Sequence, residues 1–144
     1  MNRQVLAAAV VALVPLSTAA QLGPQLNIAH RGASASAPEH TFYAYDLAME
    51  MDVDMLECDL FLSKDEVPVC IHDTTVDRTS DGSGAVENFT LAELRALDFG
   101  GWFDPAFSDQ RTPLLRDALE LARGRAGVVI ELKYYGHDER LEER

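Results

Sequence analysis

The eight residues Met55-Leu56-Glu57-Cys58-Asp59-Leu60-Phe61-Leu62 combine the pattern of a buried strand with two acidic residues. Side chains alternate between the two faces of a strand, so Glu57 and Asp59 share one face and Cys58 lies on the other with three leucines. The leucine face can pack on helices. Two carboxylates side by side on a buried strand are costly unless a positive charge lies between them. The stretch therefore predicts a strand whose polar face holds a hard divalent cation, which prefers oxygen ligands.

Three further apolar runs are strand-like and surround this stretch in the chain, at 26–30, 67–72 and 128–132. Helical patterns separate them, and strands that alternate with helices are typical of βα units around a parallel sheet. The segment 74–110 is rich in Asp, Gly, Ser and Thr and is long for a simple connection. We expect it to be either a functional loop region or a small insertion.

Residues that favour the ends of helices predict where three helices begin and end. Thr41 is suited to cap the first helix, and Thr90 with Glu93 forms a capping-box pattern for a short second helix that runs to about Leu97. Pro113 opens a third helix, for which Arg123-Gly124 is a plausible stop.

All four predicted strands carry polar residues toward their ends. His30 and Arg31 follow the first strand, His72 ends the third, and Glu131 and Lys133 share a face at the end of the fourth. In β/α folds the carboxyl ends of the strands form the rim where sites lie. A single strand-end histidine is more often structural, and a single Glu-x-Asp pair is often a solvated face. The repetition of the feature at the same end of every strand favours a site.

This set of residues suits the cleavage of a phosphate ester. One histidine can remove a proton from the nucleophile while the other protonates the leaving oxygen, beside a carboxylate-bound cation. Arg31 and Lys133 could hold phosphate oxygens.

The two cysteines are predicted to stay unpaired. The same alternation applied to 67–72 places Val69 and Ile71 toward the helices and Cys70, with His72, on the other face. Cys58 and Cys70 would then lie on opposite faces of neighbouring strands, so that a disulfide between them would be strained.

Short motifs in a fixed order resemble those of the glycerophosphodiester phosphodiesterases, over about residues 27–133. The family's usual Asn is replaced by His40, and the Gly of its Lys-Asp-Gly turn by Glu66. The matching motifs are His30-Arg31-Gly32, Pro38-Glu39-His40-Thr41, Glu57-Cys58-Asp59, Lys64-Asp65-Glu66, His72-Asp73, Arg78-Thr79-Ser80-Asp81-Gly82-Ser83-Gly84, Leu97-Asp98-Phe99-Gly100-Gly101-Trp102-Phe103 and Glu131-Leu132-Lys133.

The resemblance implies a TIM (β/α)8-type barrel of the PLC-like phosphodiesterase kind and the hydrolysis of a glycerophosphodiester to an alcohol and glycerol 3-phosphate. It implies one divalent cation, Ca²⁺ or Mg²⁺, and a small-molecule substrate. The implied roles are His30 and His72 as the acid–base pair, Glu57, Asp59 and Glu131 as metal ligands, Arg31 and Lys133 as phosphate contacts, and Glu39 as a supporting residue.

Length limits how much of such a barrel is present. The chain has 144 residues, whereas such barrels need about 200–250. We therefore expect residues 21–144 to be the N-terminal part of a truncated domain, with about four βα units and an insertion. Half a barrel leaves strand edges unpaired, so it should be unstable alone or self-associate.

The net charge and the N-terminal residues indicate where the protein acts and what it does not bind. A net charge of -12 excludes general nucleic-acid binding. Residues 1–20 combine one Arg, an apolar run and small residues, which is typical of a signal peptide and too short for a membrane span. We expect a secreted or periplasmic protein without stable membrane insertion after cleavage.

Two rival hypotheses are compatible with the same residues. One is a non-catalytic remnant that at most binds a cation or a phosphate. The other is a relative of phospholipase D or sphingomyelinase D, which shares the design of two histidines and a carboxylate-bound metal. Such relatives look shorter between the second histidine and the next strand, so the segment 74–110 favours the glycerophosphodiester hypothesis.

Overall fold

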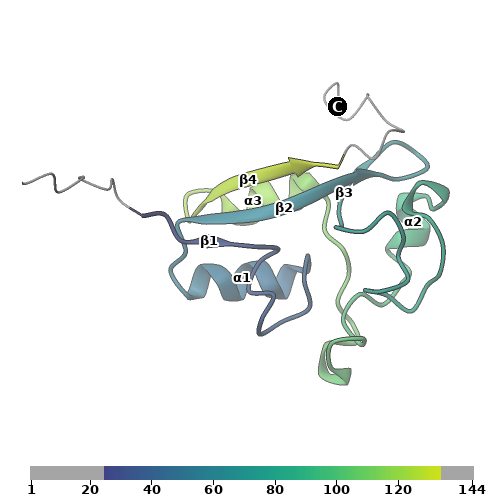
Figure 1. Ribbon diagram of the computed structural model, residues 1–144, viewed down its shortest axis with the longest axis horizontal. Coiled ribbons are helices and arrows are strands. Elements are labelled where there is room, and N and C mark those ends of the chain that lie inside the picture. The colour runs from purple at the N-terminus through teal and green to yellow at the C-terminus, as the bar shows by residue number, and fades with distance from the viewer. Residues whose placement is uncertain (1–24, 134–144) are drawn as a thin grey trace, which may run out of the picture.

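The computed structural model describes residues 25–133 (Figure 1). The predicted signal peptide and the polar residues 136–144 lie outside this range. Within the described range no helix is long and apolar enough to span a bilayer. The elements in chain order are strand β1 (Ile28–Ala29), helix α1 (Phe42–Glu50), strands β2 (Met55–Leu62) and β3 (Pro68–Cys70), 3-10 helix η1 (Val86–Asn88), helix α2 (Leu91–Leu94), 3-10 helix η2 (Pro105–Phe107), helix α3 (Leu115–Ala122) and strand β4 (Gly127–Leu132).

Strand β2 is the centre of the sheet. β1 pairs with it in parallel, with Ile28 opposite Met55. β4 also pairs with it in parallel, over a register that includes Asp59 opposite Glu131. These pairings confirm a partial α/β sheet with parallel strands, in which β1 and β4 flank β2 (Figure 1).

The prediction of four parallel βα units is wrong for the third strand. β3 runs antiparallel to β2, with Leu60 opposite Cys70 and Leu62 opposite Pro68. Only residues 63–67 connect the two strands, and a parallel crossover needs a dozen or more residues. The described sheet therefore has three parallel strands, and β3 is the return arm of a hairpin.

The predicted caps form at both of the first two helices. The Thr41 hydroxyl accepts a hydrogen bond from a backbone N–H in the first turn of α1. At α2, the Thr90 hydroxyl and the Glu93 carboxylate each accept from the other residue's N–H. α2 ends at Leu94, earlier than the predicted Leu97, because the next turn tightens into i to i−3 hydrogen bonds that end at the Leu97 N–H.

Helix α3 ends at the predicted stop but begins two residues later than predicted. It runs from Leu115, not Pro113, to Ala122, and the Asp117 carboxylate accepts a hydrogen bond from the Leu114 N–H. The chain leaves the helix at Gly124, whose φ of 73° lies in the left-handed region that glycine adopts without strain.

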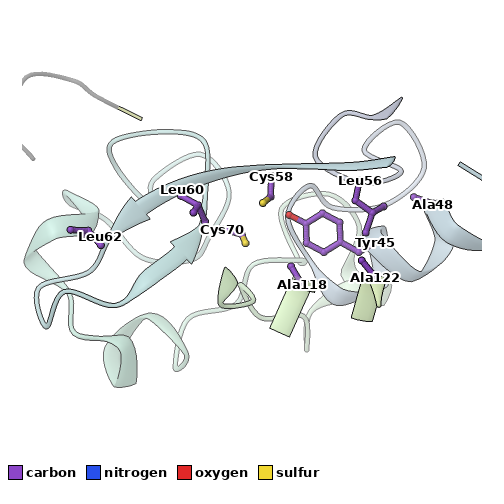
Figure 2. Close-up of a cluster of buried hydrophobic side chains, with 9 residues drawn as sticks. All are labelled: Tyr45, Ala48, Leu56, Cys58, Leu60, Leu62, Cys70, Ala118 and Ala122. Atoms are coloured by element: carbon purple, nitrogen blue, oxygen red, sulfur yellow. The ribbon is translucent and has the colours of Figure 1, made fainter. Parts of the chain in front are cut away.

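The leucine face of β2 packs against both longer helices, as predicted. Leu56, Cys58, Leu60 and Leu62 share one buried cluster with Tyr45 and Ala48 of α1 and with Ala118 and Ala122 of α3 (Figure 2). Because one face of β2 is committed to this core, Glu57 and Asp59 are directed to the opposite face of the sheet.

The faces predicted for Val69, Cys70 and Ile71 are reversed. Cys70 lies opposite Leu60 in the hairpin, so it shares the face and the core of Cys58 (Figure 2). Both thiols are free and buried, so the expectation of unpaired cysteines holds for a different reason from the one predicted. Hydrogen bonding to Cys58 and burial raise the pKa of the Cys70 thiol well above its ordinary value. Val69 and Ile71 face away from this core.

The segment 74–110 is a packed insertion with its own core. Val69 and Ile71 of the hairpin region contact Val76, Val86, Leu94 and Phe99 in a second buried cluster. The insertion carries η1, α2 and η2 and lies beyond the hairpin end of the sheet (Figure 1). Its packing ties the residues that follow β3 to a fixed position.

We predict that the core between β2 and the two longer helices provides much of the stability. Leu56→Ala, at a side chain that is 1% exposed, should lower the free energy of unfolding by about 2–5 kcal/mol through lost burial and a residual cavity. Leu119→Ala, at an exposed leucine of α3, should change it by less than about 0.5 kcal/mol. Urea unfolding followed by circular dichroism measures both, and equal effects would contradict the assignment of this core.

Candidate active site

Three carboxylates from neighbouring strands meet on the polar face of the sheet. Glu57 and Asp59 come from β2, and Glu131 comes from β4, where it lies directly opposite Asp59. One ligand oxygen from each of the three lies within 4.8 Å of the others. Asp59 is fully buried, Glu57 is nearly so and Glu131 is exposed. Strand register therefore places together the three residues that the sequence selects as metal ligands.

Lys133 neutralises part of this negative charge. Its Nζ lies 2.9 Å from Asp59 Oδ1 and 2.6 Å from a Glu131 carboxylate oxygen. Burial alone would lower the pKa of Lys133, but the hydrogen bonds to Glu131 and Asp59 raise it above its ordinary value. Lys133 is thus a buried cation among carboxylates, on the same side as Glu131, as strand alternation predicts.

The pKa of Asp59 reflects the same balance. Burial would raise it, but hydrogen bonds donated by His40 and Lys133 outweigh burial and hold the pKa well below the ordinary value of an aspartate. Asp59 therefore stays ionised although it is buried, and an ionised carboxylate is what a metal ligand requires.

The turn after β1 brings a backbone donor and a cation to the carboxylates. The Arg31 N–H donates to Glu57 Oε2 at 2.8 Å, and the Arg31 guanidinium lies 3.3 Å from Glu39 and 3.5 Å from Asp59 Oδ2. Gly32 has a φ of 77°, and a Cβ there would lie 2.8 Å from the backbone of Ala44. Only glycine lets the turn approach α1 this closely.

A chain of ion pairs leads from this turn to His72. Arg78 donates from two nitrogens to the Glu39 carboxylate, at 2.8 and 2.9 Å, and from Nε to Asp73 at 2.7 Å. Asp73 lies 2.6 Å from His72 Nδ1. Burial would raise the pKa of Glu39, but Arg78 and Arg31 lower it. The hydrogen bond from Arg78, with that from His72, lowers the pKa of Asp73 to about 2.

The hairpin explains how His72 reaches the site. Because β3 is antiparallel, the chain after Cys70 returns along β2, and the Ile71 N–H donates to the Asp59 carbonyl at 3.0 Å. His72 therefore lies near the level of the carboxylates although it does not end a parallel strand. Asp73 occupies Nδ1 of its ring, so Nε2 is the ring nitrogen that Asp73 does not contact.

His30 lies apart from this network. It follows β1, is exposed, and lines a cavity of about 230 Å³ with Ala33, Ala48 and Met51. Its carbonyl accepts from the Ser34 hydroxyl, and within residues 25–133 no hydrogen bond or ion pair of its ring is seen. Six of the predicted site residues thus lie together in the structure: Glu57, Asp59, Glu131, Lys133, Arg31 and Glu39. His72 is connected to them through the ion pairs of Asp73 and Arg78. His30 lies at the margin of the site.

Sequence reasoning missed three members of the site. Asp73 carries a local signal, because a carboxylate directly after a histidine is suited to orient its ring. Arg78 carries none, since its partner Glu39 is 39 positions away. His40 stands out only as a departure from the resembled motif. Its ring lies between Asp59 and Tyr45, at 2.9 and 2.8 Å.

The site has the form of a cation centre at one end of a parallel sheet, with a histidine nearby, which is the form of a metal-assisted hydrolase of the α/β barrel class. Comparison with known proteins makes the class specific. Residues 30–144 match the Glycerophosphoryl diester phosphodiesterase family. The chain belongs to this family.

Individual relatives agree in fold. The crystal structure of a glycerophosphodiester phosphodiesterase from Agrobacterium tumefaciens is 50% identical, with a TM-score of 0.72 over 74% of this chain and 46% of that one. The structure of an Oleispira antarctica phosphodiesterase in complex with the product sn-glycerol-3-phosphate is 40% identical, with a TM-score of 0.73 over 76% and 44%.

A third relative, matched by its sequence, is also covered only in part. The glycerophosphodiester phosphodiesterase of Caldanaerobacter subterraneus is 44% identical over 122 residues, which are 81% of this chain and 50% of that protein. The chain thus spans about half the length of the relatives that it matches. The described sheet corresponds to part of the TIM-barrel-like fold that the solved relatives imply.

The residues present fit a divalent cation. The three carboxylates around the Lys133 ammonium leave an excess of negative charge, which favours a bound cation. Asp59 is fully buried, with its Oδ1 2.9 Å from the Lys133 Nζ. Together with Glu57 and Glu131 it offers three hard oxygen ligands, as Ca²⁺ and Mg²⁺ prefer.

We predict that Asp73 stabilises the fold in a pH-dependent way. Its folded pKa of about 2 lies below the ordinary value of 3.8, so its stabilisation is fully present above about pH 5 and is lost as the pH falls toward 2. The difference in unfolding free energy between the wild type and Asp73→Asn should therefore shrink between pH 5 and 2.

Urea unfolding at a series of pH values measures this difference. Asp109→Asn, at an exposed aspartate of the insertion, is the matched control and should show no such trend. A difference for Asp73→Asn that stays constant down to about pH 2 would show that Arg78 does not hold this carboxylate.

Proposed function

We propose that the chain supplies the metal-binding part of a hydrolase that cleaves glycerophosphodiesters to an alcohol and glycerol 3-phosphate. The observation that carries the proposal is the cluster of three carboxylates on two adjacent parallel strands, with Lys133 among them. Membership of the family supports the substrate class. The packed insertion at 74–110 is consistent with the same class and not with the shorter phospholipase D-like alternative.

The proposed cofactor is one Ca²⁺ or Mg²⁺ held by Glu57, Asp59 and Glu131. When bound, the cation polarises a phosphoryl oxygen and offsets the charge that develops in the transition state. Arg31 and Lys133 would contact the remaining phosphate oxygens, since both of these positively charged side chains lie at the carboxylate cluster. Glu39 holds both Arg31 and Arg78 and so fixes the turn that carries Arg31.

His30 and His72 are proposed as the acid–base pair. One removes the proton from the attacking oxygen, and the other donates a proton to the leaving alkoxide as the P–O bond breaks. Overall, one water adds across the bond. Asp73 orients the His72 ring by accepting from Nδ1, which fixes the tautomer and directs Nε2 away from Asp73. His30 is exposed after β1 and would meet the substrate at the margin of the carboxylate cluster.

We also propose that the protein is exported. The proposal rests on residues 1–20, where a single Arg precedes an apolar run and small residues. Export to the periplasm or the medium would place the enzyme where free glycerophosphodiesters can diffuse to it. N-terminal sequencing of the protein from an extracellular or periplasmic fraction tests this proposal. We expect a new N-terminus near residue 21.

Hydrolysis of glycerophosphocholine by the full chain tests the activity directly. We expect release of glycerol 3-phosphate that stops on addition of EDTA and returns with Ca²⁺ or Mg²⁺. His30→Ala and His72→Ala should each lower kcat by about 10²–10⁴-fold, the range for loss of a general acid or base.

The assay is run at several protein concentrations. Within the described residues β1 and β4 each pair on one side only, and self-association through these edges would make the activity depend on concentration.

Asp109→Asn is the control variant and should retain the wild-type rate. A folded, soluble chain that releases no glycerol 3-phosphate at any concentration would contradict the proposal and favour the non-catalytic remnant. Activity that survives both histidine substitutions would refute the acid–base assignment while leaving the substrate class in place.

A further inference from the structure

His40 occupies an unusual position behind the carboxylate cluster. Its side chain is 4% exposed, and its φ of 51° lies in the left-handed region. Its N–H donates to the Arg31 carbonyl at 3.2 Å, which joins the loop before α1 to the turn after β1. Non-glycine residues with positive φ are rare, and His, Asn and Asp are enriched among them. The backbone therefore restricts this position to a few residue types, and His and Asn are two of them.

The partners of the His40 ring determine which nitrogen carries its proton. Nε2 lies 2.9 Å from Asp59 Oδ2, and Nδ1 lies 2.8 Å from the Tyr45 hydroxyl. An ionised carboxylate only accepts hydrogen bonds, so Nε2–H is the donor. In the neutral ring Nδ1 is then an acceptor, and the Tyr45 hydroxyl donates to it. The result is a directed chain from Tyr45 through His40 to Asp59.

The far end of this chain is rigid. Tyr45 is fully buried in the core between β2 and the helices, and its ring lies near Leu56 and Ala122 (Figure 2). Burial raises the pKa of its hydroxyl well above the ordinary value, so the hydroxyl keeps the proton that it donates. The core therefore fixes the orientation of the His40 ring through one hydrogen bond.

We infer that His40 is a positioning residue for the cation, held by Tyr45. His40 holds Oδ2 of Asp59, so the carboxylate is fixed in one orientation, with Oδ1 beside the Lys133 ammonium and one carboxylate oxygen within 4.8 Å of ligand oxygens of Glu57 and Glu131. The inference rests on the divalent cation of the proposed function. It assigns His40 no contact with the substrate, because the ring lies behind Asp59 and is buried.

A purely structural role for His40 makes a different prediction. A histidine that only satisfies core groups would affect stability and leave the affinity of the folded protein for the cation unchanged. A histidine that positions Asp59 changes that affinity, because loss of a residue that orients a ligand typically costs about 10–100-fold in metal binding. Metal affinity measured on folded protein therefore separates the two roles.

Calorimetric titration of the full chain with Ca²⁺, and separately with Mg²⁺, is the test. We expect His40→Ala and Tyr45→Phe to weaken binding by about 10–100-fold and about 3–10-fold, respectively. His40→Asn should restore most of the affinity, because Asn accepts the left-handed backbone and its amide can donate to Asp59. Tyr43→Phe, at an exposed tyrosine of the same helix, is the matched control and should bind as the wild type does.

Nitrogen NMR of the histidine rings supplies a readout that stability does not affect. The wild type should show His40 as the Nε2–H tautomer, and Tyr45→Phe should move it toward a mixture of tautomers because Nδ1 loses its donor. If His40→Ala does not fold by circular dichroism, Tyr45→Phe and His40→Asn still decide the question.

The outcomes are separable from those of the hydrolysis assay, because no substrate is present. Wild-type affinity in both His40→Ala and Tyr45→Phe would overturn the inference, even for an active enzyme. Weakened affinity in these variants and recovery in His40→Asn would support it, even for an inactive chain. A wild-type chain that binds neither cation would overturn the inference together with the proposed cofactor.

Discussion

The burial of the Asp59 carboxylate governs how the segments around it are arranged. Taking an ion out of water costs on the order of several kcal/mol unless partners compensate it. Lys133 and His40 contact Asp59 directly, and Arg31 lies just beyond hydrogen-bond distance. They come from the end of β4, the loop before α1 and the turn after β1, so the charge of one residue draws three separate segments together.

The sheet and the hairpin make that convergence possible. Parallel pairing of β2 with β1 and β4 places the turn after β1 beside Glu57 and brings Glu131 of β4 opposite Asp59, at the level of the carboxylates. The hairpin then returns the chain to that level, where His72 and Asp73 join Arg78 and Glu39. The insertion core holds the residues after β3 in place. Half of a barrel sheet thus already contains a continuous network from the carboxylates to one of the proposed catalytic histidines.

Much of this could be predicted from the sequence, for physical reasons that are local. The alternation of Glu57, Cys58 and Asp59 gives both faces of β2 correctly, and the Thr90 cap marks the start of α2. The direction of β3 was predicted wrongly because an apolar run shows that a strand exists and not which way it runs. The short link at 63–67 was the available signal. That error also reversed the faces of Cys70 and Val69.

The contacts of Arg78 with Glu39 and of His40 with Tyr45 and Asp59 could not be predicted in the same way. They join residues that periodicity treats as independent, and they form only when the turn after β1 closes on α1.

The proposed function depends on the binding of one divalent cation by Glu57, Asp59 and Glu131. A crystal structure of the full chain grown with Ca²⁺ tests whether they do. We predict a single ion within about 2.3–2.6 Å of an oxygen from each of the three residues. An ion bound elsewhere, or Lys133 retained between Asp59 and Glu131 at saturating Ca²⁺ with no ion present, would contradict it.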